Sequence, residues 1–135
     1  MSTSQAVQIL GENIKIGQGF GAVELAAAIL LNAKKVAAAG NSLATGTTLA
    51  SGLSMVTGAD GTKCVTLPAT PTVGELFIVW NTDESSTLEV YPGSGDSINA
   101  ASAEAPFTVA AMGCIILVAF SAGQYYAVEP AVAAV

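Results

Sequence analysis

The clearest structural signal in this chain is the stretch GCIILVAFSAGQYYAVE, residues 113–129. Its first part, CIILVAF, is apolar at every position and rich in the β-branched and aromatic residues that favour strands. The tripeptide SAG (121–123) supplies a tight turn, and QYYAVE (124–129) resumes as a second strand. The stretch predicts a β-hairpin. Because CIILVAF is apolar on both faces, we expect it in the middle of a sandwich or against a partner subunit.

Further candidate strands precede this hairpin, each rich in Val, Ile, Thr and aromatic residues and bounded by turn-forming residues. They are LSMVT (53–57), KCVTLP (63–68), ELFIVWN (75–81), TLEVYP (87–92) and APFTVAA (105–111). The tripeptide AMG (111–113) is a second candidate for a tight hairpin turn. Short strands at this spacing predict a mainly β chain: an antiparallel β-sandwich, jelly-roll-like domain or small barrel over residues 46–129, with a C-terminal tail at 130–135.

The first 45 residues differ in composition, since they are rich in alanine. Residues 1–45 are predicted to be an N-terminal arm that docks on a neighbouring molecule, with NIKIGQGF (13–20) as a strand or extended segment. The segment Ala22 to Ala39 consists of good helix formers and is followed by Gly40, which predicts one short helix. Pairing of ILLNAKKV (29–36) as a β-strand is the alternative.

The composition points to assembly rather than to catalysis. Among 135 residues, 52% are hydrophobic and only 10% are charged. So few charges leave neutral surface that tends to be covered by another subunit, and a homodimer or homotrimer is therefore expected. The uninterrupted apolar tract 25–31 is far shorter than the roughly 20 residues that span a bilayer, and no signal peptide is evident. We expect no membrane partner.

Several classes of chemistry are disfavoured. The sequence contains no histidine and no arginine, and its net charge is −6. A basic patch for nucleic acid cannot be built from four lysines spread along the chain. Without histidine, the commonest general base is missing, so no catalytic residue, cofactor or enzymatic activity is predicted. Cys64 and Cys114 are expected to be free thiols on buried strands.

The loop in LEVYPGSGDSINA (88–100) is rich in glycine, as phosphate-binding loops are, but the residues around it do not fit such a site. No basic residue follows Lys63, and Ile98 stands where a dinucleotide fingerprint requires a third glycine. We therefore interpret the loop as architecture. Pro92 ends the strand, Asp96 folds back onto nearby backbone N–H groups, and Ile98 returns as an apolar plug into the core.

Three kinds of functional site could be built from the acidic and aromatic residues of this region. Asp96, Asn99 and Glu104 lack the spacing of an EF-hand, so no metal site is predicted. Asp96 and Glu104 are the pair that a carboxylate-dependent hydrolase would use. Trp80 and the pair Tyr125–Tyr126 would be the stacking platform of a lectin-like domain, although strand aromatics are more often core or interface anchors.

The order of these segments forms a longer pattern. It runs from a Leu-Pro pair after a strand, through a glycine-led strand ending in Asn, to L-V-YP, G-D-IN, F-V and a final G-YY. The matching positions are Leu67, Pro68, Gly74, Asn81, Leu88, Val90, Tyr91, Pro92, Gly95, Asp96, Ile98, Asn99, Phe107, Val109, Gly123, Tyr125 and Tyr126. This pattern, over residues from about 50 to 129, resembles a β-module that recurs in virion proteins of tailed bacteriophages.

The resemblance implies a structural role. A short chain with this module is similar to the small decoration, or cement, proteins that sit on phage capsids, which implies the major capsid protein as partner and the virion surface as location. It implies no catalytic, metal-binding or cofactor-binding residues. The alternatives are a head-fibre or tail-fibre module and the lectin-like carbohydrate-binding domain. Residues 1–45 have no counterpart in the pattern.

Overall fold

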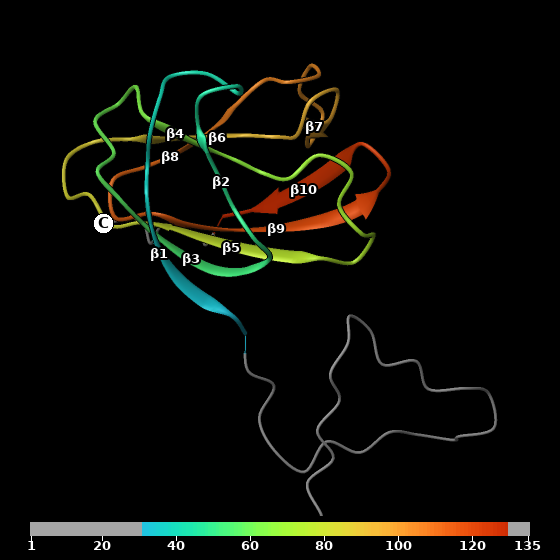
Figure 1. Ribbon diagram of the computed structural model, residues 1–135, viewed down its shortest axis with the longest axis horizontal. Helices are drawn as coiled ribbons and strands as arrows, with labels where there is room; N and C mark the ends of the chain where they lie inside the picture. Colours follow the sequence, from blue (N-terminus) through green and yellow to red (C-terminus); the bar gives the residue numbers. More distant parts are fainter. Residues whose placement is uncertain (1–30, 130–135) are drawn as a thin grey trace, which may run out of the picture. The chain divides into compact units, whose positions relative to one another are not determined.

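A computed structural model describes residues 31–129 of the chain (Figure 1). The predicted extended segment 13–20, the first part of the predicted helix and the tail 130–135 lie outside the described residues. Residues 31–129 contain ten β-strands and no helix, so the prediction of a mainly β chain is confirmed.

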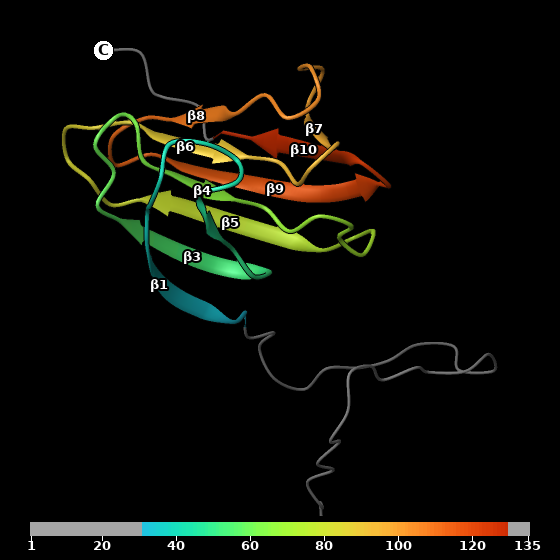
Figure 2. The ribbon, with the colours of Figure 1, turned by 45° about the horizontal axis from the view of Figure 1, so that its top comes forward.

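The strands form two sheets, which we call sheet A and sheet B (Figure 2). Sheet A has the order β1-β3-β5-β9-β10-β7, formed by β1 (Ala33–Ala37), β3 (Gly52–Thr57), β5 (Leu76–Asn81), β9 (Cys114–Ser121), β10 (Gln124–Val128) and β7 (Ser97–Ile98). Sheet B has the order β2-β4-β6-β8, formed by β2 (Thr47–Thr48), β4 (Cys64–Thr66), β6 (Leu88–Tyr91) and β8 (Phe107–Val109). All seven strands expected from the sequence are present.

Consecutive strands alternate between the two sheets from β1 to β9. The chain therefore returns to the same sheet with every second strand. As a result, β1, β3 and β5 are paired in parallel in sheet A, and β2, β4 and β6 are paired in parallel in sheet B. Of the eight strand pairs in the described part, five are parallel and three antiparallel. The predicted antiparallel arrangement is thus wrong. Both sheets are mixed, and they do not clearly follow a jelly roll.

The two predicted hairpin turns have different outcomes. Ala122 and Gly123 join β9 to β10, which pair antiparallel, so the hairpin at 121–123 is confirmed. The turn at 111–113 instead connects β8 of sheet B to β9 of sheet A, closed by a bond from Gly113 N to Ala110 O (2.9 Å). That hairpin prediction is wrong because a tight turn can also carry the chain across to the opposite sheet.

The predicted helix is wrong where the structure describes it, since Ala33–Ala37 form β1, parallel to β3. The alternative of β-pairing is therefore confirmed for residues 33–36. Pairing with an existing strand edge outweighs the weak helix preference of alanine and lysine.

The boundary predicted at residue 45 also differs from the structure. The segment after β1 covers sheet B: Cys64 Sγ donates to Ala39 O (3.3 Å), and Thr66 Oγ1 donates to Leu43 O (3.0 Å). Residues 33–46 therefore belong to the β-domain.

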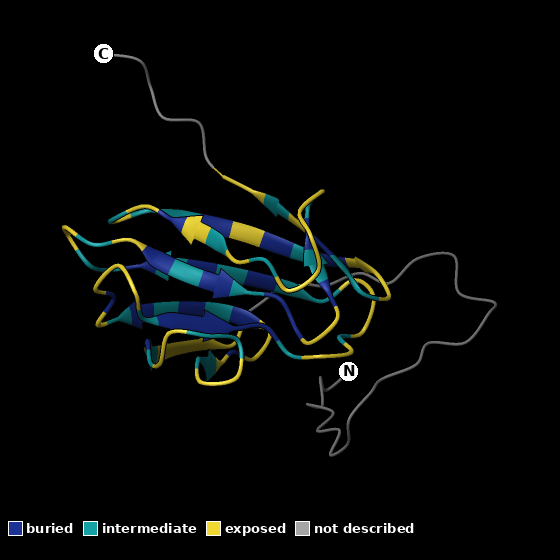
Figure 3. Ribbon diagram, turned by 90° about the horizontal axis from the view of Figure 1, so that it is seen from above, coloured by how far each residue is buried: buried dark blue, intermediate teal, exposed yellow. Residues whose placement is uncertain are grey.

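One hydrophobic cluster joins the two sheets. Buried positions alternate with half-buried ones along β3, β5 and β6, and with half-buried or exposed ones along most of β9 (Figure 3). The most deeply buried side chains come from both sheets and their connections: Val56, Val65, Leu67, Phe77, Val79, Leu88, Val90, Ile98, Val109, Ile115, Leu117 and Tyr125. Sheet A thus has one face in the core, whereas the residues on the other face of β3, β5, β9 and β10 are half-buried or exposed.

Replacement of Gly52 by alanine is expected to lower the free energy of unfolding by about 2 kcal/mol, from a positive φ and a steric clash together. Gly52 has a φ of 105°, and a Cβ there would overlap the carbonyl oxygen of Asn32, which accepts a hydrogen bond from Leu53 N (2.8 Å). The matched control is Gly58→Ala, where φ is 76° and nothing lies within 4 Å of the added carbon. It should cost only about 1 kcal/mol. Urea unfolding measures both, and equal losses would contradict the prediction.

Candidate interaction surface

Sheet A presents an unusual second face. In β9, Ile115, Leu117 and Ala119 are buried in the core, while Ile116 and Phe120 point the other way and are exposed. Register places the outward residues of neighbouring strands side by side, because directly paired residues project from the same side of a sheet. Ile116 thus lies between Ile78 of β5 and Val128 of β10.

We call this the outer apolar face. Its members are the outward apolar residues of β3, β5, β9 and β10: Leu53, Met55, Leu76, Ile78, Trp80, Cys114, Ile116, Val118, Phe120, Tyr126 and Val128. None of them is buried, and none of the outward positions in these four strands carries a charge. Lys35, on β1, lies at the edge of the face beside Met55. Contiguous apolar surface of this kind marks a protein contact site.

The most exposed members gather on β9 and β10. Val128 is 63% exposed, Phe120 66% and Tyr126 48%. The rings of Phe120 and Tyr126 meet edge to face, with centroids 5.3 Å apart. Aromatic side chains held in this way offer large contact area at low entropic cost, which is why they are enriched at the centres of protein interfaces.

The structure separates residues that the sequence treated alike. Tyr125 is fully buried and packs edge to face on Phe77 (5.9 Å), whereas Tyr126 belongs to the outer apolar face. The pair therefore forms no shared platform for a sugar. The sequence indicated that CIILVAF is apolar on both faces, but it did not show which residues point outward, and Met55, Ile116, Phe120 and Val128 were missed as candidates. The alternation of side chains between the two faces of each strand is the signal that could have identified them.

Most of the residues in the phage-like pattern support the fold, because they fill the core, form turns or make hydrogen bonds between segments. Asn81, Leu67, Leu88, Val90, Pro92, Ile98 and Tyr125 are buried, and Ile98 fills the core as expected. Gly74, Gly95 and Gly123 have positive φ at turns. Pro68 accepts a hydrogen bond from the Tyr125 hydroxyl (2.8 Å), and Tyr91 O accepts one from Leu67 N (2.8 Å). Asn99 Oδ1 accepts from Ala127 N (2.9 Å), and Phe107 packs against the edge of the core.

The loop after β6 is closed by a different carboxylate from the one expected. Glu104 Oε1 accepts from Gly95 N (2.9 Å) and from the Ser94 hydroxyl (3.2 Å). Asp96 is only 7% exposed, and its Oδ2 has no hydrogen-bond partner. The expectation that Asp96 folds back onto backbone N–H groups is therefore wrong. Burial raises the pKa of the Asp96 carboxyl above its usual range.

This buried carboxyl has a predictable effect on stability against pH. A raised folded-state pKa contributes stability below the unfolded pKa, and that contribution is lost as the pH rises through the folded pKa. At pH 7 we therefore expect the free energy of unfolding of Asp96→Asn to exceed that of the wild type by about 1 kcal/mol. The gain should vanish near pH 3. Thermal melts across this range measure the difference.

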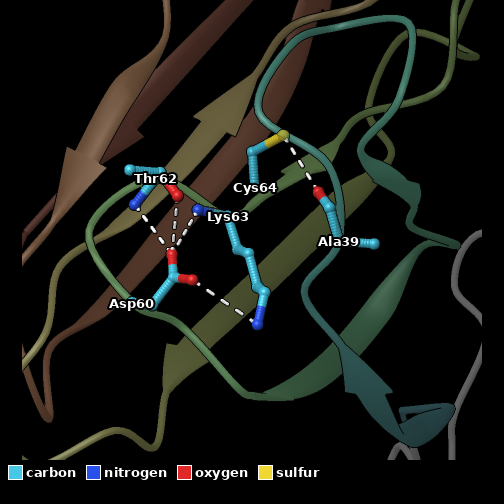
Figure 4. A network of polar contacts seen from close by, with 5 residues as sticks. All are labelled: Ala39, Asp60, Thr62, Lys63 and Cys64. Carbon is cyan, nitrogen blue, oxygen red and sulfur yellow. Dashed lines mark hydrogen bonds and ion pairs between the residues drawn. The ribbon is translucent and has the colours of Figure 1, made fainter.

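Asp60 is the matched control of opposite sign (Figure 4). Its Oδ1 accepts from the backbone N–H groups of Lys63 (2.8 Å) and Thr62 (2.9 Å), and these two bonds hold the pKa of Asp60 below its usual range. Its contribution is present above the unfolded pKa and is lost as the pH falls. Asp60→Asn should therefore destabilise at pH 7 and become neutral in strong acid. A gain at neutral pH for both variants would show that removal of charge alone is responsible.

The remaining polar groups form no reactive cluster. Asp60 pairs with Lys63 Nζ at 3.5 Å, on an exposed turn. Cys64 and Cys114 are free thiols in different sheets. Within residues 31–129, no group of three or more His, Cys, Asp or Glu side chains is arranged to hold a metal ion. The same part of the chain has no helix of the length and apolarity that a membrane span requires.

Comparison with protein-family models, curated protein sequences and solved structures finds no match to this chain.

Proposed function

We propose that the protein is a capsid decoration protein of a tailed bacteriophage, located on the virion surface. It binds the outer surface of the assembled capsid and stabilises the shell by bridging subunits of the major capsid protein. The proposal assigns it no catalytic residue, cofactor or metal. Its fold serves to present contact surfaces.

The observation that carries this proposal is the outer apolar face, an uncharged surface spread over β3, β5, β9 and β10. A contiguous apolar face of this kind is typical of a protein that works within an assembly, where other protein covers the face. A chain with 10% charged residues and no histidine or arginine is suited to extended contact rather than to acid–base chemistry. The phage-like order of residues from about 50 to 129 supports the capsid as the partner.

The mechanism is thermodynamic. A protein that binds the assembled shell but not the free capsid subunits shifts the equilibrium towards the shell by mass action. Contacts to more than one subunit at once add avidity, because the second contact forms at a high effective concentration. The shell then resists the outward pressure of packaged DNA.

Co-sedimentation of the purified chain with empty capsid shells tests the proposal. We expect saturable binding to assembled shells, no binding to unassembled capsid protein, and a higher melting temperature of the decorated shell. A copy number per particle close to that of the major capsid protein supports decoration, whereas a few copies at one vertex or on the tail would identify a fibre module instead. No association with any virion part would disprove the proposal.

Removal of residues 1–20 is expected to abolish binding to shells, because the sequence assigns them to a docking arm. The β-domain should remain folded, since residues 33–128 contain all the described strands. Circular dichroism and thermal melting provide the control for folding. Full decoration by the truncated chain would show that docking depends on other residues.

A further inference from the structure

We propose that the outer apolar face is the contact between two copies of this chain, related by a two-fold axis parallel to the strands of sheet A. The inference deepens the proposed function, on which it rests for its biological role: with the outer apolar face closed in the dimer, docking on the shell is assigned to residues 1–20 of the two copies. It commits to a second copy as the occupant of the face.

The size of the face fits a dimer contact. Strands lie about 4.8 Å apart and rise about 3.3 Å per residue, so four strands of about six residues cover roughly 400 Å² in projection. Protruding side chains make the accessible area larger than its projection. Two such faces therefore bury on the order of 1,000 Å² together, the area at which specific interfaces begin.

The charge distribution favours self-association over a charged partner. The whole chain has a net charge of −6, yet none of the outward positions of β3, β5, β9 and β10 is charged. Two copies can therefore meet through this face without burying any charge, which would be costly. Homodimer interfaces are distinguished by this apolar character, whereas transient contacts with other proteins are more polar.

The charge at one edge of the face selects the axis. Lys35 projects from β1 at one edge, level with Met55, Trp80 and Cys114. Val128, which is uncharged, lies at the opposite edge and pairs with Ile116 of β9. Lys35 is therefore the charge nearest to this face among the strands that form it and β1.

A two-fold axis parallel to the strands keeps this level and exchanges the two edges. It brings Lys35 of each copy to the uncharged β10 edge of the partner subunit, so the two lysines lie far apart. An axis across the strands would instead place the two β1 edges, and their lysines, on the same side. Juxtaposition of like charges is costly at an interface, and this cost favours the axis parallel to the strands.

Analytical ultracentrifugation of the full chain over a concentration series tests the proposal. The wild type should sediment as a dimer. Val128→Asp, at a position 63% exposed on the face, should raise the dimer dissociation constant at least about 100-fold, because symmetry introduces the charge twice. Val73→Asp is the matched control, since Val73 is 62% exposed but lies in the connection between β4 and β5. It should dimerise like the wild type.

Removal of the lysine charge tests the axis. Lys35→Ala should leave the dimer dissociation constant within about twofold of the wild type, because the proposed axis keeps the two lysines apart. A markedly tighter dimer would show that two lysines had repelled each other and would overturn the proposed orientation. Circular dichroism confirms that each variant is folded.

A monomeric wild type at every concentration would overturn the proposal, and nitration of Tyr126, read by mass spectrometry, would then identify the true occupant. Protection of Tyr126 in the isolated monomer would assign the face to residues 1–30 of the same chain. Protection that appears only on capsid shells would assign it to the capsid surface. Dimerisation is measured without capsids, so its failure is distinguishable from failure of the proposed function.

Discussion

Replacement of Tyr125 by alanine is expected to lower the free energy of unfolding by about 4 kcal/mol, as large aromatic side chains do when they are removed from a core. Tyr125 is fully buried, and its ring packs edge to face on Phe77 at 5.9 Å. Its hydroxyl donates to Pro68 O (2.8 Å), and so it ties the β4–β5 connection to β10. Urea unfolding at a fixed protein concentration measures the loss.

The variant Tyr125→Phe separates the ring from the hydroxyl. It keeps the packing on Phe77 and leaves Pro68 O without its donor, which should cost about 1 kcal/mol. Burial raises the pKa of the Tyr125 phenol well above its usual range, so this contribution should not change between pH 6 and pH 9. Losses of similar size for the two variants would show that the hydroxyl, and not the ring, accounts for the effect.

Asn81→Ala should lower the free energy of unfolding by about 3 kcal/mol through lost hydrogen bonds rather than lost packing. The Asn81 side chain is fully buried, and its Nδ2 donates to Ser86 O (2.8 Å) and Ala110 O (3.1 Å). Its Oδ1 accepts from Asp83 N (3.1 Å). One amide therefore joins the ends of β5 and β8 to the turn between β5 and β6. Asn41→Ala is the control, because Asn41 is exposed.

Asn81→Asp sharpens this test, because it preserves the shape of the side chain. At neutral pH the new carboxylate would face the carbonyl oxygens of Ser86 and Ala110 with no proton to donate. We expect a greater loss than for alanine at pH 7, with partial recovery in acid as the carboxyl becomes protonated. Equal stability of Asn81→Asp and the wild type at pH 7 would contradict the assigned hydrogen bonds.

The sequence predicted strands well because strand propensity and alternation are local properties. CIILVAF and QYYAVE identify β9, β10 and their hairpin directly. The sequence could not predict which strands pair. A short turn can return the chain along the same sheet or carry it across to the opposite sheet. The strands β2 and β7 have two residues each and are too short for any pattern.

Two local errors have specific causes. Residues 33–37 contain alanine and lysine, which favour a helix, and become a strand only because the edge of β3 is available. Asp96 has the right position for an Asx turn, but the backbone N–H groups of Ser97 and Asn99 donate to Gly123 O (3.0 Å) and Tyr125 O (2.8 Å) instead. This pairing of β7 with β10 depends on how the loop folds, which spacing does not reveal. The outer apolar face likewise required the register of four strands before its members could be identified.

The alternation of strands between the sheets also bears on the order in which the protein can form during synthesis. Each of the strands β1 to β4 pairs with the second strand that follows it in the chain, and not with the first. No hairpin of consecutive strands can therefore form early in synthesis. The contact of β5 with β9 joins residues 76–81 to residues 114–121. Until that later segment has emerged, the edge of β5 has unpaired backbone N–H and C=O groups, and the core side of the newly made half of sheet A is only partly covered. Nascent chains arrested before residue 114 should therefore be the ones that chaperones retain.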